Sequence, residues 1–332
     1  MVAAVPPASP REVVADAFER HKRFLWGLCY RMLGSAADAD DLVQETFARA
    51  LARPPRHTDE PLRPWLVQVA TNLARDLLRR RRRGGYVGPW LPSPIPTDDD
   101  EPPAHEPVLL DDNGRPITTE ARYDLMESVS FAFLLALEAL TPRQRAVLLL
   151  RDVFDYSVAR TADALAMTDA HVKVTHHRAR RAMHGYDRVR VRLSRERRQA
   201  AGDVLVRFLS ALTRGDAEAA EALLAEDVKV LSDGGGEFLA ARKPVVGRAR
   251  VVQFYRNLLT RHAPPDLRAE ARVLNGAAAV VVEGTPPRPN IAARTAVVCE
   301  LNADGQISRL YSVLATRKLS ALDWSASPPH SG

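Results

Sequence analysis

Side chains that can bind nucleic acid recur on one face of a predicted helix that begins near Asp169. They are Lys173, His177, Arg178 and Arg181. Arg and Lys donate hydrogen bonds to guanine O6 and N7 in the major groove and to the flanking phosphates. The other face of this helix carries Val172, His176, Ala179 and Met183 at core spacing. The alternative is a solvated basic face on an ordinary helical hairpin, since runs of charge are commonly exposed.

The elements around this helix have the pattern of a helix-turn-helix. Thr141-Pro142 places a capping residue before a proline at the first helical position, and the helical run then extends to Arg151. A second helical segment spans 158–165, and Thr168 follows in a tight turn where it can cap the helix from Asp169. A helix in this position enters the major groove in DNA-binding proteins of this type.

A compact helical domain is predicted upstream, over residues 11–85. Its second helix, 36–51, opens with acidic residues suited to a helix N-terminus. Prolines interrupt the pattern between 54 and 61, and a further helix from 64 to 83 ends in five successive arginines. The polar side of that helix carries Asn72, Arg75, Asp76, Arg79 and Arg80. Asn and Asp suit base edges, whereas arginines suit phosphates.

Charge is unevenly distributed along the 332 residues, whose formal net charge is +6. Ten Lys or Arg lie between 173 and 198 against two acids, whereas ten acids lie between 98 and 127 against two arginines. The segment 86–124 is also rich in proline and cannot bury enough apolar surface to fold alone. We therefore predict two basic modules, the second over 125–190, joined by an acidic linker. Trp90, Leu91 and Pro92 give the start of this linker the character of a docking peptide, and the alternative is a tryptophan that folds back on its own domain.

Composition excludes several classes of protein. Cys29 and Cys299 lie far apart and each has apolar neighbours, which argues against a disulfide framework or a zinc site. No stretch approaches the roughly 18 apolar residues of a membrane span, and the N-terminal residues lack a basic region followed by an apolar one. We expect a cytoplasmic protein without membrane contact, without a metal and without a cofactor.

The C-terminal part changes character after Gln199. Helical patterns over 204–212, 217–224 and 251–259 are followed by strand patterns over 277–283, 295–302 and 307–314, after an earlier strand at 228–231. This order predicts an α+β domain over residues 200–318.

Taken together, the first 190 residues resemble bacterial sigma factors of the extracytoplasmic-function type, which make RNA polymerase recognise particular promoters. Residues 38–47, DADDLVQETF, resemble the helix that binds core polymerase, and 65–80, WLVQVATNLARDLLRR, resemble the segment that reads and opens the −10 element. Residues 140–181 resemble the helix-turn-helix that reads the −35 element. The resemblance implies two all-α sigma domains, with core RNA polymerase and promoter DNA as partners and a protein that is monomeric when free. It assigns polymerase contacts to Asp38, Asp41, Gln44 and Glu45. It assigns DNA contacts to the polar residues named above on the two helices and to Val174.

The C-terminal domain resembles the SnoaL-like (cystatin/NTF2-like) domain fused to one subgroup of these sigma factors, the SigJ-like or ECF41-like proteins. Trp90-Leu91-Pro92 matches the start of the subgroup's WLPEP motif, although Ser93 replaces its acid, and the subgroup's C-terminal NPDKL-type motif is not evident near Arg317-Lys318-Leu319. The resemblance implies a regulatory contact between this linker motif and the loop Asp233, Gly234, Gly235 and Gly236. It implies a multidomain, non-enzymatic sigma factor whose last domain regulates activity in cis.

Two alternatives remain open for the C-terminal domain. One is a ligand-gated regulator, in which the cone-shaped cavity of the SnoaL-like fold binds a small apolar molecule and changes the docking. The other is an enzyme fused to a DNA-binding module. Acid-base chemistry would need a carboxylate, His or Tyr aimed into an apolar pocket, and the candidates are Asp227, Asp233, Tyr255 and Tyr311. No pair among them has a spacing that identifies a reaction, and an aspartate before three glycines is most simply a tight loop.

Overall fold

The computed structural model describes residues 10–53, 62–97, 123–190 and 194–324. Most of the predicted acidic linker, 98–122, lies outside these ranges. The described chain forms two compact units. Unit 1 takes the residues up to Gly84 together with 123–128 and 132–190, and unit 2 takes 85–97, 129–131 and 194–324. The expected order of helical regions followed by an α+β domain is confirmed.

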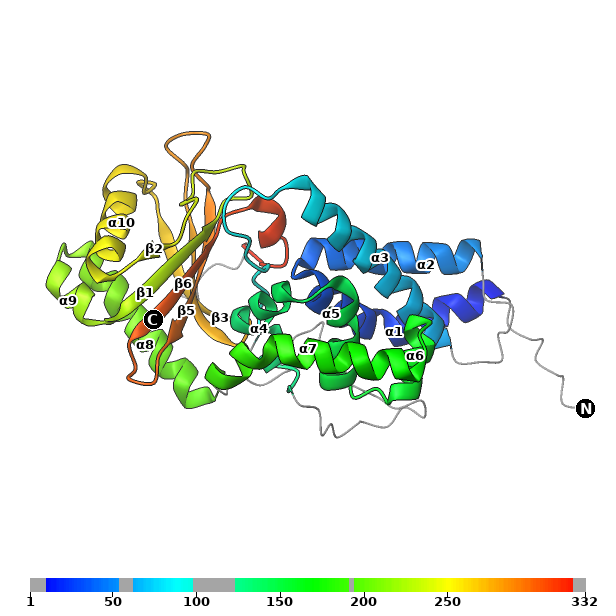
Figure 1. Ribbon diagram of the computed structural model, residues 1–332. Helices are drawn as coiled ribbons and strands as arrows, with labels where there is room; N and C mark the ends of the chain where they lie inside the picture. Colours follow the sequence, from blue (N-terminus) through cyan, green and yellow to red (C-terminus); the bar gives the residue numbers. More distant parts are fainter. Residues whose placement is uncertain (1–9, 54–61, 98–122, 191–193, 325–332) are drawn as a thin grey trace, which may run out of the picture. The chain divides into compact units, whose positions relative to one another are not determined.

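Unit 1 is helical. Its first part contains α1 (Pro10–Leu33), α2 (Ala36–Ala52) and α3 (Leu62–Gly84), which are labelled in Figure 1. Ser35 accepts a hydrogen bond from the Asp38 amide and so caps the first turn of α2. The three helices pack through the side chains that helical spacing places on one face of each, and α3 buries Leu66, Val67, Ala70, Ala74 and Leu78.

The second part of unit 1 contains the expected helix-turn-helix. It begins with η1 (Glu127–Val129) and α4 (Phe131–Ala136), of which Val129 and Phe131 belong to unit 2. The elements that follow are η2 (Leu137–Ala139), α5 (Pro142–Leu148), a π-helical turn η3 (Leu149–Val153), α6 (Val158–Leu165) and α7 (Asp169–Val189). Thr141 and Gln144 form a capping box at the start of α5. The turn between α6 and α7 passes through Ala166, whose φ of 50° is left-handed, and Thr168 then caps α7. This turn sets the direction of α7 relative to α6.

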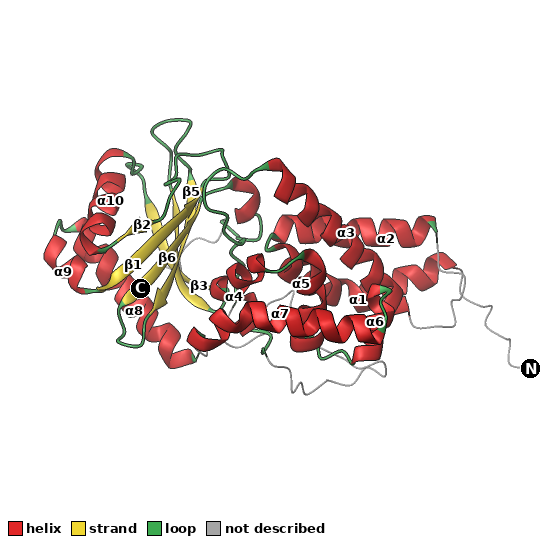
Figure 2. Ribbon diagram, in the orientation of Figure 1, coloured by secondary structure: helices red, strands yellow, loops and turns green. Residues whose placement is uncertain are grey.

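Unit 2 is a curved six-stranded sheet with helices on one face (Figure 2). Its elements are α8 (Arg195–Thr213), α9 (Ala217–Ala222), β1 (Leu224–Asp233), β2 (Val245–Val246), α10 (Arg248–Arg261), β3 (Arg268–Leu274), β4 (Ala277–Glu283), β5 (Arg294–Leu301), β6 (Ile307–Val313) and the 3-10 turn η4 (Thr316–Leu319). The strand order is β2-β1-β6-β5-β4-β3, in which β1 and β6 are parallel and the other neighbours antiparallel.

Apolar side chains fill the space between the helices and the inner face of the sheet. This core includes Leu205, Phe208, Val228, Val230, Val251, Tyr255, Val280, Cys299 and Leu310. Because successive strand residues point to opposite faces, Leu310 lies in this core whereas Tyr311 points to the outer face.

The edge strand β3 was not among the expected strands. Its sequence RAEARVL puts charged residues on alternate positions, and its first four residues are exposed, so its apolar signal is weak. A stronger signal stood next to it, because Asn275-Gly276 is the dipeptide that two-residue hairpins favour. Both residues have left-handed φ values, 53° and 72°, and Leu274 pairs with Ala277 across the turn.

The start of the predicted linker is part of unit 2. Leu91, Ser93 and Ile95 are all buried to 2% exposure or less, and Pro96 bridges to Leu274. The segment 86–97 cannot form structure of its own, but the sheet supplies its partners. Because segment 86–97 has too little apolar surface to fold alone, its composition predicted a linker.

Candidate functional site

The DNA-binding residues predicted on α7 form one exposed face. Lys173, Val174, His177, Arg178 and Arg181 are all exposed, and the side chain of Val174 retains 49% of its accessible surface. The opposite face buries Val172, Thr175, Ala179 and Met183. His176 lies between the two faces and is half-buried. The arrangement can present cations to phosphates and base edges along one side of a helix.

Asp152 holds α7 against the preceding turn. It is 2% exposed, and its carboxylate accepts hydrogen bonds from Arg180 Nε (3.0 Å) and Nη2 (2.7 Å). The same carboxylate lies 2.8 Å from His176 Nε2. Burial alone would raise the pKa of Asp152, but His176 and Arg180 outweigh it and hold this pKa below its ordinary value. Arg180 is therefore committed to orienting the helix, unlike the neighbouring Arg178.

The polar residues predicted on α3 also line one side of their helix. Asn72, Asp76, Arg79 and Arg80 are exposed and Arg75 is half-buried. Arg75 Nη1 donates to Asn72 Oδ1 at 3.2 Å, and Arg79 Nη1 donates to Asp76 Oδ1 at 3.1 Å. Burial, followed by repulsion from Arg143 and Arg79, lowers the pKa of Arg75. The side therefore presents amide, carboxylate and guanidinium groups together.

The residues predicted to contact polymerase lie on α2. Asp41, Gln44 and Glu45 are exposed, and Asp38 is half-buried in the first turn. Glu45 pairs with Arg49 one turn later at 2.7 Å. Leu42, Val43 and Phe47 point into the core of unit 1, so the polar residues share the outer side of α2.

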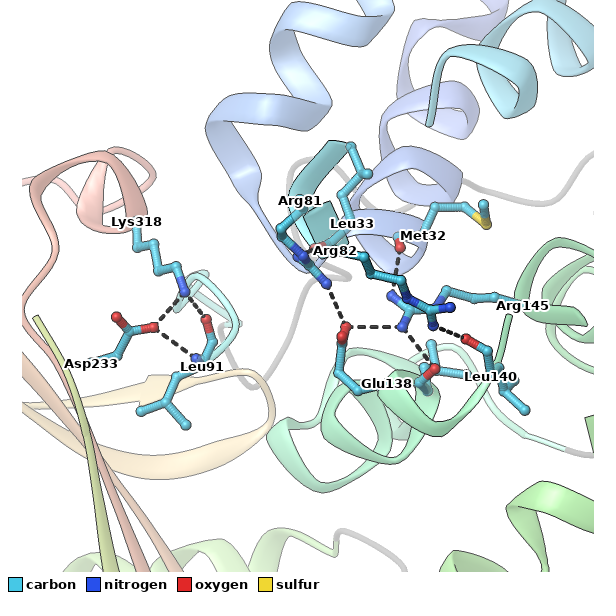
Figure 3. A network of polar contacts seen from close by, with 11 residues as sticks. Met32, Leu33, Arg81, Arg82, Leu91, Glu138, Leu140, Arg145, Asp233 and Lys318 are labelled. Atoms are coloured by element: carbon cyan, nitrogen blue, oxygen red, sulfur yellow. Dashed lines mark hydrogen bonds and ion pairs between the residues drawn. The ribbon is translucent and has the colours of Figure 1, made fainter. Parts of the chain in front are cut away.

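A buried polar network in unit 2 joins the linker motif to the loop after β1 (Figure 3). The carboxylate of Asp233, which is fully buried, accepts from the Leu91 amide (2.7 Å), from Tyr86 Oη (2.6 Å) and from the Gly235 amide (3.0 Å). Lys318 Nζ lies 2.5 Å from Asp233 Oδ2 and donates to the Leu91 carbonyl. We call these residues, together with Trp90, the linker lock: Tyr86, Trp90, Leu91, Asp233 and Lys318.

Aromatic rings complete the linker lock. Lys318 Nζ lies 4.5 Å from the ring centroid of Trp90 and 4.7 Å from that of Tyr86, within the range of cation–π attraction. Gly235, at φ +62°, lets the loop pass close to η4, because a Cβ there would lie 2.8 Å from that of Ala315. The structure thus brings Trp90 and Leu91 together with the Asp233 to Gly236 loop.

Tyr86 and Lys318 are members of the linker lock that the sequence did not identify as site residues. Lys318 was not identified because Arg317-Lys318-Leu319 does not match the full NPDKL-type motif, although the segment contains the lysine-leucine pair with which that motif ends. A lysine with apolar neighbours in a segment following the last strand is a usable signal, since lysine is rarely buried without a partner.

Asn275 provides a second attachment for the segment 86–97. Its Oδ1 accepts from the Ile95 amide (2.8 Å) and its Nδ2 donates to the Val129 carbonyl (2.6 Å). Thr97 then pairs with the β3 backbone through its amide and the Val273 carbonyl at 3.1 Å. The segment is therefore bound near β1 and again near β3.

The four candidates for acid-base chemistry do not converge. Tyr255 packs against Phe208 in the core on the inner face, whereas Tyr311 donates to Glu300 on the other face. Burial raises the pKa of both hydroxyls, reinforced at Tyr311 by Glu300. Asp227 is exposed, and Asp233 is enclosed by the linker lock. Within the described ranges no cluster of His, Cys, Asp and Glu has the composition of a metal site.

A groove of about 830 Å³ lies beside the linker lock in unit 2. Its walls include Arg268, Glu283 and Arg294 from three neighbouring strands, Leu319 of η4, and Trp324. Arg294 pairs with Glu283 at 3.0 Å and lies 5.1 Å from the Trp324 ring. Because η4 also carries Lys318, the groove and the linker lock share one structural element.

Comparison with known families agrees with this arrangement. The chain matches the models for Sigma-70 region 2 over residues 17–84, Sigma-70, region 4 over 130–183, and the SnoaL-like domain over 205–310. None of the helices in the described part of the chain has the length and apolar character of a membrane span.

Individual relatives point the same way. The chain is 34% identical over 268 residues to the ECF RNA polymerase sigma factor SigG of Mycobacterium tuberculosis, covering 78% of this chain and 70% of that protein. It is 29% identical to SigJ of the same organism, over 89% of this chain and 90% of that one. The crystal structure of SigJ superimposes with a TM-score of 0.65 and 25% identity, covering 92% and 98% of the two chains. The chain belongs to the ECF RNA polymerase sigma factors, which bind core RNA polymerase and direct initiation at particular promoters, and it carries a fused C-terminal SnoaL-like domain.

Proposed function

We propose that the C-terminal domain regulates this sigma factor in cis by capturing the segment that follows the −10-reading helix. The observation that carries the proposal is the linker lock, in which a fully buried Asp233 binds the Leu91 amide while Lys318 binds the Leu91 carbonyl. The captured segment begins at Tyr86, two residues after α3 ends at Gly84. Holding it restricts where α3 and the helix-turn-helix can go relative to each other.

The proposal assigns DNA contacts to the exposed faces of α3 and α7 and polymerase contacts to the outer side of α2. Supporting it are the exposure of these side chains and the apolar packing behind them. It assigns no catalytic role to the C-terminal domain, because its candidate acid-base groups lie at separate places.

The test is run-off transcription with core RNA polymerase on a promoter from upstream of the protein's own gene. Three proteins are compared: the full chain, a truncation after Gln199, and the full chain with Asp233→Asn. We expect the truncation and the variant to change transcript yield in the same direction while still binding polymerase. Equal yield from all three would remove the regulatory claim, and no transcript from any of them would favour an ordinary DNA-binding regulator.

Ligand gating is a second candidate, favoured by the groove that shares η4 with the linker lock. A molecule that displaces Leu319 or Thr316 would move Lys318, which lies in the same short turn. The proposal predicts a ligand whose binding raises the melting temperature of the wild type and not of Arg294→Gln, and which alters transcription only in the wild type. Binding without any effect on transcription would refute gating.

A further inference from the structure

Glu138 joins the two parts of unit 1. It lies in η2, and its Oε1 accepts from Arg81 Nη2 of α3 at 2.7 Å and from Arg145 Nη2 of α5 at 2.9 Å (Figure 3). Arg145 Nη1 also donates to the Met32 carbonyl at 2.7 Å, and Arg81 Nη1 donates to the Leu33 carbonyl at 2.9 Å. The Arg81–Glu138 and Arg145–Met32 bonds therefore cross between the first three helices and the helix-turn-helix part, whereas the Arg81–Leu33 bond fixes Arg81 within the first part.

The two arginines differ in how deeply they are placed. The Arg145 side chain is 2% exposed, so it cannot leave without losing its Glu138, Leu137 and Met32 partners. The Arg81 side chain is 23% exposed and Glu138 is 34% exposed, so water and ions reach their contact. Burial would raise the pKa of Glu138, but Arg145 and Arg81 outweigh it and lower this pKa, which keeps the carboxylate charged.

Arg81 belongs to the basic end of α3, which is suited to phosphate. The neighbouring arginines are exposed: Arg79, Arg80, Arg82 and Arg83. Arg82 Nη2 also donates a hydrogen bond to the Leu140 carbonyl at 2.6 Å. Carboxylate and phosphate both accept the paired donors of a guanidinium, so they compete for the same side chain. Arg81 cannot satisfy Glu138 and a DNA phosphate with the same donor.

Promoter geometry requires the contact to open. Elements at −10 and −35 are separated by about 25 base pairs, or about 85 Å at about 3.4 Å per base pair. A module of about 70 residues has a radius of gyration of about 11 Å, so two touching modules have centres about 30 Å apart. In unit 1 the end of α3 and the start of the helix-turn-helix part touch through Arg82 and Leu140. This closed arrangement cannot reach both elements.

We propose that Glu138 is an internal substitute for promoter phosphate. In the free protein Glu138 binds Arg81 at the basic end of α3, and it releases Arg81 when DNA phosphate takes its place. The proposal rests on the proposed DNA contacts of α3 and not on the linker lock. Arg145 keeps Glu138 and the Leu137 carbonyl after release and loses only the Met32 carbonyl. Arg81 is the side chain that exchanges Glu138 for phosphate.

The test uses the full chain labelled for single-molecule energy transfer at Ala48→Cys on α2 and Asp163→Cys on α6. Both positions are exposed, whereas the native Cys29 and Cys299 are 1% exposed and will not label. Three substitutions are compared with the wild type. Glu138→Gln removes the charge with little change of shape, Arg81→Gln removes the same contact from the other side, and Glu218→Gln is a matched control on the exposed side of α9.

We expect Glu138→Gln and Arg81→Gln each to raise the ratio of open to closed molecules about tenfold, and Glu218→Gln to leave it unchanged. Binding to a 40-base-pair duplex, followed by anisotropy, separates the roles. Glu138→Gln should bind up to about tenfold more tightly, because the competent state is more populated. Arg81→Gln should bind with a salt slope smaller by about 0.9, because one phosphate contact is lost.

Two outcomes would overturn the proposal. One is an energy-transfer distribution for both substitutions that matches Glu218→Gln. The other is opening without tighter binding by Glu138→Gln, which would show that Arg81 is not withheld from DNA. Melting curves accompany each variant, and if Glu138→Gln fails to fold, Arg81→Gln decides alone, because it leaves the buried Arg145 paired. If Asp233→Asn changed transcription while Glu138→Gln left both the open-to-closed ratio and duplex binding as in the wild type, this proposal would be rejected and the regulatory one kept.

Discussion

Replacing Lys318 by methionine should loosen the segment 86–97 where the linker lock holds it, while the second attachment through Asn275 remains. Methionine keeps most of the length and the apolar contact with Trp90 and Tyr86, so the change removes the charge and the two polar contacts. Removing one partner of a buried ion pair costs about 3–5 kcal/mol. Asp233 retains the Tyr86, Leu91 and Gly235 donors, so we place the loss at about 2–3 kcal/mol.

Hydrogen exchange read by mass spectrometry measures this loss where it occurs. The exchange rate of a protected amide follows the free energy of local opening, so about 2–3 kcal/mol accelerates exchange of the 86–97 peptide about 30- to 150-fold. The matched control is Lys243→Met, at an exposed position outside the linker lock. Peptides from α1 and α2 should exchange as in the wild type.

The reasoning also predicts a partial rescue. Asp233→Asn combined with Lys318→Met removes both charges, so no buried charge remains without its partner. The double variant should therefore exchange more slowly than Lys318→Met alone. Exchange of the 86–97 peptide within about threefold of the Lys243→Met control would refute the assignment of Lys318 as the residue that holds this segment.

Three further predictions follow from the same structure. Arg178→Ala should weaken holoenzyme binding to the −35 element by about 1–3 kcal/mol if the contact is bidentate to a base. A uniform loss on every DNA sequence would instead make Arg178 a phosphate contact. Arg180→Ala should lower the melting temperature, because that side chain holds Asp152. Gly235→Ala should lower the unfolding free energy by about 1–3 kcal/mol more than Gly85→Ala. Both glycines have left-handed φ values, but only a Cβ at position 235 would meet Ala315. Equal losses in denaturant titrations would contradict this. Burial, then Arg63 and Arg20, lowers the pKa of His21 to about 4. As pH falls the unfolded chain therefore binds its proton first, and stability that is present above pH 6.5 is lost toward pH 4, by less than about 2 kcal/mol after allowance for solvent screening. If the unfolding free energy of His21→Gln varied with pH between 7 and 5 just as that of the wild type does, this prediction would be rejected.

Local sequence signals predicted the helical part of the fold well. Capping residues such as Ser35, Thr141 and Thr168 act on amides two or three positions away, so the residues that begin each helix are readable in the chain itself. The exposed face of α7 followed in the same way, because helical periodicity separates the cations from Val172 and Met183. Edge strand β3 escaped this reasoning, since one of its faces and its outer edge have few partners to impose an apolar pattern.

By itself, then, the sequence determined the helical periodicity, the caps, the separation of charge, and the residue types on the exposed face of α7. Only the tertiary structure decided which charges are withdrawn from solvent. Lys318 and Asp233 are 85 residues apart, Leu91 and Asp233 are 142 apart, and Arg81 and Glu138 are 57 apart. The partner of a buried charge is chosen by the packing that excludes water around it, and residues so far apart leave no local spacing from which that choice can be read.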